Sequence, residues 1–120
     1  MNNTLLRAEF NFKFAQFTLY AIGVKKINFI ITDFHRTAIQ QNKRFLEKKS
    51  LCDGYEKISN HQKWRAKDLV IIDKNGNPIW GHIPKYDILG EIWKSLDGRW
   101  GSDWFKENKT KWDDVYHFEY

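Results

Sequence analysis

The sequence feature that most constrains the fold is a short apolar strand followed at once by a tight turn. Residues 67–73 are KDLVIID, a run rich in β-branched and aliphatic residues, and KNGNP comes directly after it. An Asn-Gly pair in this position is typical of a β-hairpin turn, because it tolerates the positive φ angles that such turns need. We therefore expect residues 78–83, PIWGHI, to return as an antiparallel strand.

The rest of the chain mixes helical and strand patterns without a regular βαβ rhythm. Phe10, Phe14 and Phe17 lie at helical spacing and predict a helix over residues 4–24 that ends near Gly23, with a local strand as the alternative. The other expected elements are strands over 26–32 and 115–120, helices over 37–49 and 86–96, and a loop over 97–114. Thr37 is expected to be the N-cap of the first of these helices. In the second, the residues expected to face inward are Ile88, Leu89, Ile92, Trp93 and Leu96. This mixture predicts an α+β fold with a small, largely antiparallel sheet.

Size and composition indicate one globular domain spanning residues 1–120. Of the 120 residues, 42% are hydrophobic and 17% aromatic, which is enough for a real core. The single cysteine, Cys52, excludes an internal disulfide and a cysteine-based zinc cluster. The N-terminus lacks a signal-peptide pattern, and no segment approaches the roughly 18 apolar residues of a membrane span. We therefore expect a soluble protein made in the cytoplasm without a signal peptide.

The formal net charge of +5 favours polyanionic partners, which include nucleic acid, anionic lipid and an anionic cell wall. Lysine and arginine are scattered among acidic residues, so a charge that serves only solubility is an equal alternative.

Two histidines and an aspartate form a candidate set of metal ligands. His61 and Asp68 begin and end the segment HQKWRAKD, and His117 lies near the C-terminus in DDVYHFE. Two imidazoles and one carboxylate suit zinc and leave its fourth position open, as catalytic zinc sites do. Asp114 is a candidate general base, which requires it to lie in a turn before the strand of His117, because residues three apart on a flat strand face opposite sides.

Several segments together resemble one family of enzymes. SNHQKWRAKD (59–68) resembles the S-x-H-x-x-G-x-A-x-D motif of zinc D-Ala-D-Ala carboxypeptidases, D-Ala-D-Ala dipeptidases and L-alanyl-D-glutamate endopeptidases. DVYHFE (114–119) is similar to the closing motif of that family, and DFHRTAIQQN and RWGSDW are similar to two of its other segments. The resemblance covers roughly residues 31–120 and implies a hedgehog/DD-peptidase-like fold, with helices packed on one side of a small antiparallel sheet.

Carried over by position, the resemblance implies one zinc ion per chain, held by His61, Asp68 and His117. It implies that Asp114 is the catalytic acid and base, and that Arg36 stabilises the oxyanion and contacts the substrate.

The resemblance also implies supporting roles for two further residues, and at a third position this chain differs from the motif. Ser59 is expected to bind the substrate or an adjacent ligand, and Glu119 to support a metal ligand. Trp64 replaces the glycine of the motif, and it is expected to line the substrate cleft or shield the metal.

The remaining histidines and tryptophans match no motif position with a known role. His35 and His82 are interpreted as ordinary surface or hairpin residues. Trp100, Trp104 and Trp112 are expected to form either a satellite core under the long loop or a wall of the cleft.

The function that the resemblance implies is hydrolysis of an amide bond in the stem peptide of peptidoglycan. We expect a monomeric phage or prophage endolysin that cuts L-Ala-D-Glu, with no nucleic-acid partner. A D-Ala-D-Ala carboxypeptidase and a catalytically degenerate binding domain are the alternatives, and a basic nucleic-acid-binding domain is a more distant one.

Overall fold

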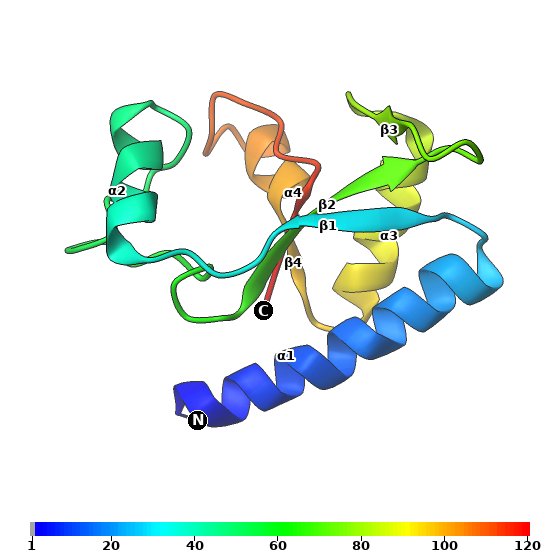
Figure 1. The fold of residues 1–120 in the computed structure, drawn as a ribbon, viewed down its shortest axis with the longest axis horizontal. Helices are drawn as coiled ribbons and strands as arrows, with labels where there is room; N and C mark the ends of the chain where they lie inside the picture. The colour runs from blue at the N-terminus through cyan, green and yellow to red at the C-terminus, as the bar shows by residue number, and fades with distance from the viewer. Residues whose placement is uncertain (1) are drawn as a thin grey trace.

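The computed structural model describes residues 2–120 and shows an α+β fold (Figure 1). Its elements are α1 (Asn3–Thr18), a π-helical segment η1 (Leu19–Val24), β1 (Phe29–Asp33), α2 (Ala38–Leu46), β2 (Ala66–Ile72), β3 (Pro78–Ile79), α3 (Pro84–Ser95), β4 (Arg99–Trp100), α4 (Gly101–Lys106) and β5 (His117–Glu119). No helix in the described residues is long and apolar enough to cross a membrane.

The five strands form one antiparallel sheet, as the sequence predicts. The order is β1-β2-β5-β4, and β3 also pairs with β2. The predicted hairpin is confirmed, because Ile79 of β3 pairs with Ile71 of β2 across the turn at Gly76, which has a φ of 83°. The returning strand is shorter than predicted and covers residues 78–79 instead of 78–83. β2 is the central strand, and it contacts β1, β3 and β5.

One face of the sheet carries an aromatic core. Leu69 and Ile71 of β2 point to this face, together with Phe118 of β5. The core is closed by α1 and α3, which contribute residues such as Phe14 and Trp93 and lie on the same side of the sheet in Figure 1. Burying each of these side chains stabilises the fold by about 1.5–3 kcal/mol.

The opposite face of the same strands is polar. Asp68 lies next to Leu69 in β2, and His117 lies next to Phe118 in β5, so both point away from the aromatic core. The strand register pairs Asp68 directly with His117. Helices α2 and α4 border this second face, where their residues meet those of β2 and β5 in a common cleft.

The segment 97–114, predicted as a loop, contains β4 and the short helix α4. Trp100 lies in the main core rather than in a satellite, and only 1% of its surface is exposed. The ring of Trp100 packs against Gly90 of α3, where an added Cβ would lie 2.2 Å from it. This contact joins residues of two separate elements, and a pattern within one segment does not reveal it.

The predicted helices are confirmed with shifted ends. Helical structure ends at Val24, next to the predicted stop at Gly23, but its last six residues form the π-helical segment η1. Thr37 caps α2 as predicted, and its hydroxyl accepts a hydrogen bond from the backbone N–H of Gln40. Ile88 of α3, predicted to face inward, is 40% exposed, whereas Leu89 and the other buried residues of α3 do enter the core.

A tight turn joins Ser59 to β2 and holds the segment that resembles the family motif. Its end has the hydrogen bonds of a helix C-terminus, with the N–H of Arg65 donating to the carbonyl of Asn60 at 2.9 Å. Trp64 lies at the position of this turn that glycine normally fills, and its φ is 61°. Its ring stacks on His35 with 3.9 Å between ring centroids. The glycine of the motif is therefore explained by backbone conformation.

Replacing Trp64 by glycine or by alanine should separate the backbone term from the ring contacts. Both variants lose the stacking on His35, but only glycine adopts the positive φ without steric strain. We expect Trp64→Gly to unfold with a free energy about 1 kcal/mol higher than Trp64→Ala, measured by urea denaturation. The control is the same pair of substitutions at Lys43 in α2, where we expect Lys43→Gly to have a free energy of unfolding about 1 kcal/mol lower than that of Lys43→Ala. Equal stabilities at position 64 would contradict this assignment.

Candidate metal centre

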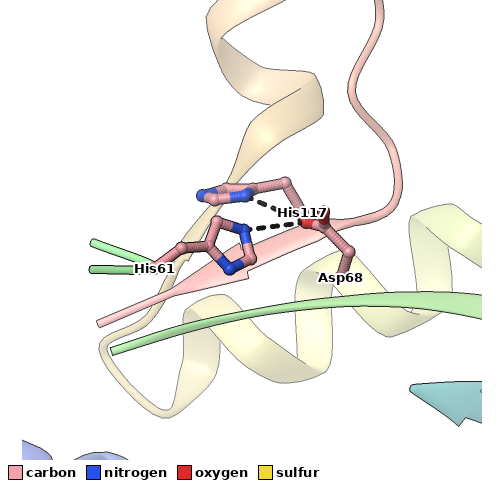
Figure 2. Close-up of side chains that lie close together, drawn as sticks. All are labelled: His61, Asp68 and His117. Carbon is pink, nitrogen blue, oxygen red and sulfur yellow. Dashed lines mark hydrogen bonds and ion pairs between the residues drawn. The ribbon is translucent and has the colours of Figure 1, made fainter. Parts of the chain in front are cut away.

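Three side chains predicted as metal ligands meet on the polar face of the sheet. One nitrogen of His61, one nitrogen of His117 and one carboxylate oxygen of Asp68 all lie within 4.8 Å of one another. Figure 2 shows the three groups pointing toward a common centre from three different segments, namely the turn before β2, β2 itself and β5.

His61 is fixed in one orientation by its backbone surroundings. Its Nδ1 donates a hydrogen bond to the carbonyl oxygen of Phe34, and only 1% of the residue is exposed. Because a carbonyl can only accept, Nδ1 carries the proton, and the lone pair of Nε2 is directed at the centre. This Nε2 lies 3.2 Å from Oδ1 of Asp68.

His117 is fixed by the carboxylate of Glu119. Its Nε2 lies 2.8 Å from Oε1 of Glu119, and its Nδ1 lies 3.1 Å from Oδ1 of Asp68. Burial disfavours the imidazolium, but the hydrogen bonds to Asp68 and Glu119 outweigh it and raise the pKa of His117 to about 10.

Glu119 is itself held by two neighbours. Asn60 donates to its Oε2 at 2.6 Å, and Nε of Arg99 donates to the same oxygen at 2.8 Å. Burial opposes its charge, but the hydrogen bonds from His117 and Arg99 lower the pKa of Glu119 to about 2. Glu119 therefore lies in contact with a candidate ligand and orients it, which is the role the sequence predicts for it.

Asp68 is oriented from its other oxygen. Nη2 of Arg36 donates to Oδ2 of Asp68 at 3.1 Å. The guanidinium of Arg36 is held in place by two further hydrogen bonds. Its Nε donates to Oδ2 of Asp33 at 2.7 Å, and its Nη1 donates to Oε1 of the buried Gln41 at 2.9 Å. Burial opposes ionisation of Asp68, but the hydrogen bond that it accepts from His117 lowers its pKa well below the ordinary value. The carboxylate is therefore ionised and fixed.

The donor set fits a zinc ion. Each histidine uses one ring nitrogen for an outer partner and directs the other at the centre, which is the arrangement of zinc-binding histidines. The third donor is an ionised carboxylate, and two imidazoles with one carboxylate leave room for a fourth ligand. His61, His117 and Asp68 would hold the ion.

Asp114 lies in the loop before β5, as its predicted role requires. Its backbone carbonyl accepts a hydrogen bond from the N–H of His117 at 3.2 Å, so the chain turns between the two residues. Gly101 allows this turn to pack closely, because a Cβ there would lie 2.5 Å from the Asp114 carbonyl oxygen. Burial raises the pKa of the Asp114 carboxyl, and the charge of Asp68 raises it further. A carboxylate with a raised pKa is a suitable general base.

The three ligands lie in a cleft of about 900 Å³. Ser59, Arg36 and Asp114 also line it, so the structure brings these predicted site residues together. Trp64 is not among the lining residues, and its ring packs instead against Phe34, with 5.5 Å between ring centroids. The geometry therefore does not support the predicted contact of Trp64 with substrate or metal.

The tryptophans of the segment 97–114 divide between core and cleft. Trp104 and Trp112 line the cleft, and the ring of Trp104 lies 5.4 Å from that of His117. Trp100 is a core residue. Trp104 and Trp112 therefore agree with the predicted cleft wall, whereas Trp100 fits neither predicted alternative, because it lies in the main core.

The other two histidines lie at the surface and outside the cleft lining. His35 stacks on Trp64. His82 lies between two carboxylates, with Nδ1 2.7 Å from Asp113 and Nε2 2.8 Å from Asp87.

Sequence reasoning missed several residues that orient the ligands. Gln41 is the clearest case: it lies in DFHRTAIQQN, one of the segments that resemble the family, but no role was predicted for it there. Phe34 acts through its backbone carbonyl, which leaves no signal in its side chain. Asn60 is adjacent to His61 within the motif segment, and this adjacency is the one available clue to its contact with Glu119.

Comparison with known proteins finds likeness at the level of structure. No family model matches the sequence, and no curated protein matches it. A solved structure of the Serratia marcescens L-Ala D-Glu endopeptidase ChiX matches with a TM-score of 0.58 at 18% identity, over 78% of this chain and 66% of that one. The chain therefore spans just under two thirds of that enzyme's length.

A second solved structure is the vancomycin resistance D,D-pentapeptidase VanY, an E175A mutant from a VanB-type cassette in complex with Zn(II). It matches with a TM-score of 0.61 at 13% identity, over 92% of this chain and 70% of that one. The chain thus has the fold of these two peptidases, which is the fold that its motifs led us to expect.

Proposed function

We propose that this protein is a zinc-dependent peptidase that hydrolyses an amide bond in the stem peptide of bacterial peptidoglycan. The observation that carries the proposal is the convergence of His61, Asp68 and His117 at the base of a cleft that also contains Asp114. Its fold is shared with a peptidoglycan endopeptidase and a zinc-bound D,D-pentapeptidase, which supports the same conclusion.

The residues of the cleft divide the chemistry among them. His61, Asp68 and His117 would hold a zinc ion, which would supply a Lewis acid and a water that is nucleophilic near neutral pH. Asp114 accepts the proton of the attacking water and then delivers it to the departing amine nitrogen, a task suited to its raised pKa. Arg36 presents a fixed positive charge to the oxygen that becomes an oxyanion. Ser59 provides a hydroxyl for the substrate at the edge of the cleft.

The bond we propose is the one between L-Ala and D-Glu, cut by a monomeric enzyme of the phage endolysin type. The match to the Serratia endopeptidase supports this choice, and the net charge of +5 suits an anionic wall. The D-Ala-D-Ala carboxypeptidase is the second candidate, because the matched D,D-pentapeptidase aligns over 92% of this chain.

Mass spectrometry of digested peptidoglycan distinguishes the two. The protein is incubated with purified peptidoglycan alone, with chelator, and with zinc restored. New amino termini at D-Glu identify the endopeptidase, and loss of terminal D-Ala identifies the carboxypeptidase. Zinc-loaded, folded protein that leaves several wall types unchanged would refute the peptidase and favour a binding domain.

Removing a ligand should abolish stoichiometric zinc binding. We expect the wild-type chain to bind about one zinc ion, and His61→Ala or His117→Ala to bind it at least ~100-fold more weakly, because each loses a donor of a three-ligand set. Isothermal titration calorimetry gives affinity and stoichiometry. His82→Ala is the matched control, because its ring already faces two carboxylates outside the cleft. Equal weakening in the control would argue against this centre.

Zinc binding should release a proton. Without metal, His117 is protonated up to its pKa of about 10, so binding at Nδ1 must displace that proton at any lower pH. Zinc affinity should therefore rise as the pH rises from 6 to 8, by up to ~10-fold per unit for one proton. Calorimetry in two buffers of different ionisation enthalpy counts the protons released. Affinity that does not change with pH would exclude a charged His117.

Asp114→Asn should lower turnover by about 10²–10⁴-fold, because the amide cannot accept the proton of the attacking water. Zinc content should stay at the wild-type level, since Asp114 is not among the proposed ligands. The rate of stem-peptide cleavage, followed by mass spectrometry, tests this. Asp113→Asn is the neighbouring control, because that carboxylate faces His82. A zinc-loaded Asp114→Asn protein with full activity would eliminate Asp114 as the base.

A further inference from the structure

We propose that the cleft selects stem peptides whose carboxylates are free rather than amidated, and that a cationic wall makes this selection. The cationic wall consists of Arg44, Lys48, Lys49 and Lys57. This inference rests on the proposed function and specifies the substrate of that same site.

The cationic wall comes from one continuous segment. Arg44 lies in α2, and Lys48, Lys49 and Lys57 follow in the loop after it, so all four line the cleft from the α2 end. Four other lining residues come from later in the chain and are aromatic, namely Trp80, Trp104, Trp112 and Tyr116. The cleft therefore offers a bound peptide both cationic and aromatic side chains.

The positive charge of this wall is only partly balanced by the protein. Arg44 contacts Asp33 at 3.3 Å, and Lys49 contacts the exposed Glu47 at 3.8 Å. Lys48 and Lys57 form no ion pair with any residue in the range 2–120.

The acidic groups of the cleft do not balance the wall either. Asp68, Asp114 and Glu119 are the acidic residues among its lining, and they lie at the metal centre. Asp68 and Glu119 are already paired with Arg36 and Arg99. The wall therefore presents charge that an anionic substrate can neutralise.

Lys48 has a backbone conformation that makes its side chain unnecessary for the fold. It follows the end of α2 with a φ of 61°, at a turn closed by a 2.8 Å hydrogen bond from the N–H of Lys49 to the carbonyl of Arg44. Glycine is the residue that this position usually holds, because it adopts positive φ without steric strain. Lys48 is exposed and is one of the residues that line the cleft, so its side chain contributes to the charge of the wall.

Stem peptides differ in the charge that this wall would meet. The D-glutamyl residue is joined through its side-chain carboxyl and keeps a free α-carboxylate, and a diaminopimelyl residue keeps another. Amidation turns each of them into a neutral carboxamide of nearly the same shape. Lysine ammonium groups attract the carboxylate and gain little from the amide, so the wall separates the two forms by charge.

The test uses two synthetic pentapeptides, L-Ala-γ-D-Glu-diaminopimelyl-D-Ala-D-Ala with free carboxylates and its counterpart amidated on the glutamyl and diaminopimelyl residues. Mass spectrometry detects cleavage at either candidate bond. For the zinc-loaded wild-type chain we expect kcat/KM to be at least ~10-fold higher for the free peptide, with the difference shrinking at high salt.

Two wall variants and one control locate the effect. Lys48→Gly and Lys57→Gln should each lower kcat/KM for the free peptide by about 3–10-fold, mainly through KM, and leave the amidated peptide unchanged. Lys48→Gly should unfold no more easily than the wild type, which separates lost binding from lost stability. Lys74→Gln removes one charge at the exposed β2–β3 turn outside the cleft, and both peptides should keep their wild-type rates.

A binding measurement distinguishes failure of the proposed peptidase activity from failure of the proposed selectivity. Calorimetry measures the binding of both peptides to the zinc-loaded Asp114→Asn protein. If the Asp114→Asn protein binds the free peptide more tightly than the amidated one, and the wild-type protein cleaves neither, the selectivity is retained and the peptidase is refuted. Cleavage of both peptides at equal rates would refute the selectivity and retain the peptidase. An equal loss of kcat/KM for both peptides in Lys48→Gly would also overturn the selectivity. So would a Lys48→Gly protein that adsorbs less to whole cell walls but cleaves both peptides at wild-type rates, and this result would indicate that the cationic wall binds a polyanion of the cell wall instead.

Discussion

The candidate site depends on the pairing of β2 with β5, because this pairing decides which side chains share the polar face. In the observed register Asp68 lies opposite His117, and Lys67 lies opposite Phe118. A shift of one residue would move Asp68 to the aromatic face and bring an apolar residue to the metal centre. The aromatic core below the sheet prevents this shift, since Leu69 would also have to leave it. The core therefore fixes the chemistry through the register.

The three candidate ligands are held in place by contacts with neighbouring residues. His61 depends on a backbone carbonyl, His117 on Glu119, and Asp68 on Arg36. Each support comes from a segment distant in sequence from the residue it supports, apart from Glu119. The metal centre consequently links the turn before β2, the segment after β1, and β5. A site assembled in this way forms only when the sheet is complete.

The local patterns of the sequence predicted the elements well and their long-range contacts poorly. The hairpin at Gly76 and the cap at Thr37 depend on neighbouring residues, so a short pattern contains the needed information. β4 and α4 were missed because they are short and are stabilised by contacts such as that of Trp100 with Gly90. The ligand trio was predicted from its residue types and from the resemblance, whereas the contact of Gln41 with Arg36 could come only from the fold.

The charge balance of the site explains why a metal suits it. Three carboxylates, from Asp68, Asp114 and Glu119, gather in a cleft where burial penalises each of them. Arg36 and Arg99 balance two, and without metal the proton on His117 contributes the remaining charge. A divalent cation at the same place replaces that proton and adds one further positive charge. The added charge would favour ionised Asp114 and offset part of the rise that burial causes in its pKa, so that the proposed base stays ionised.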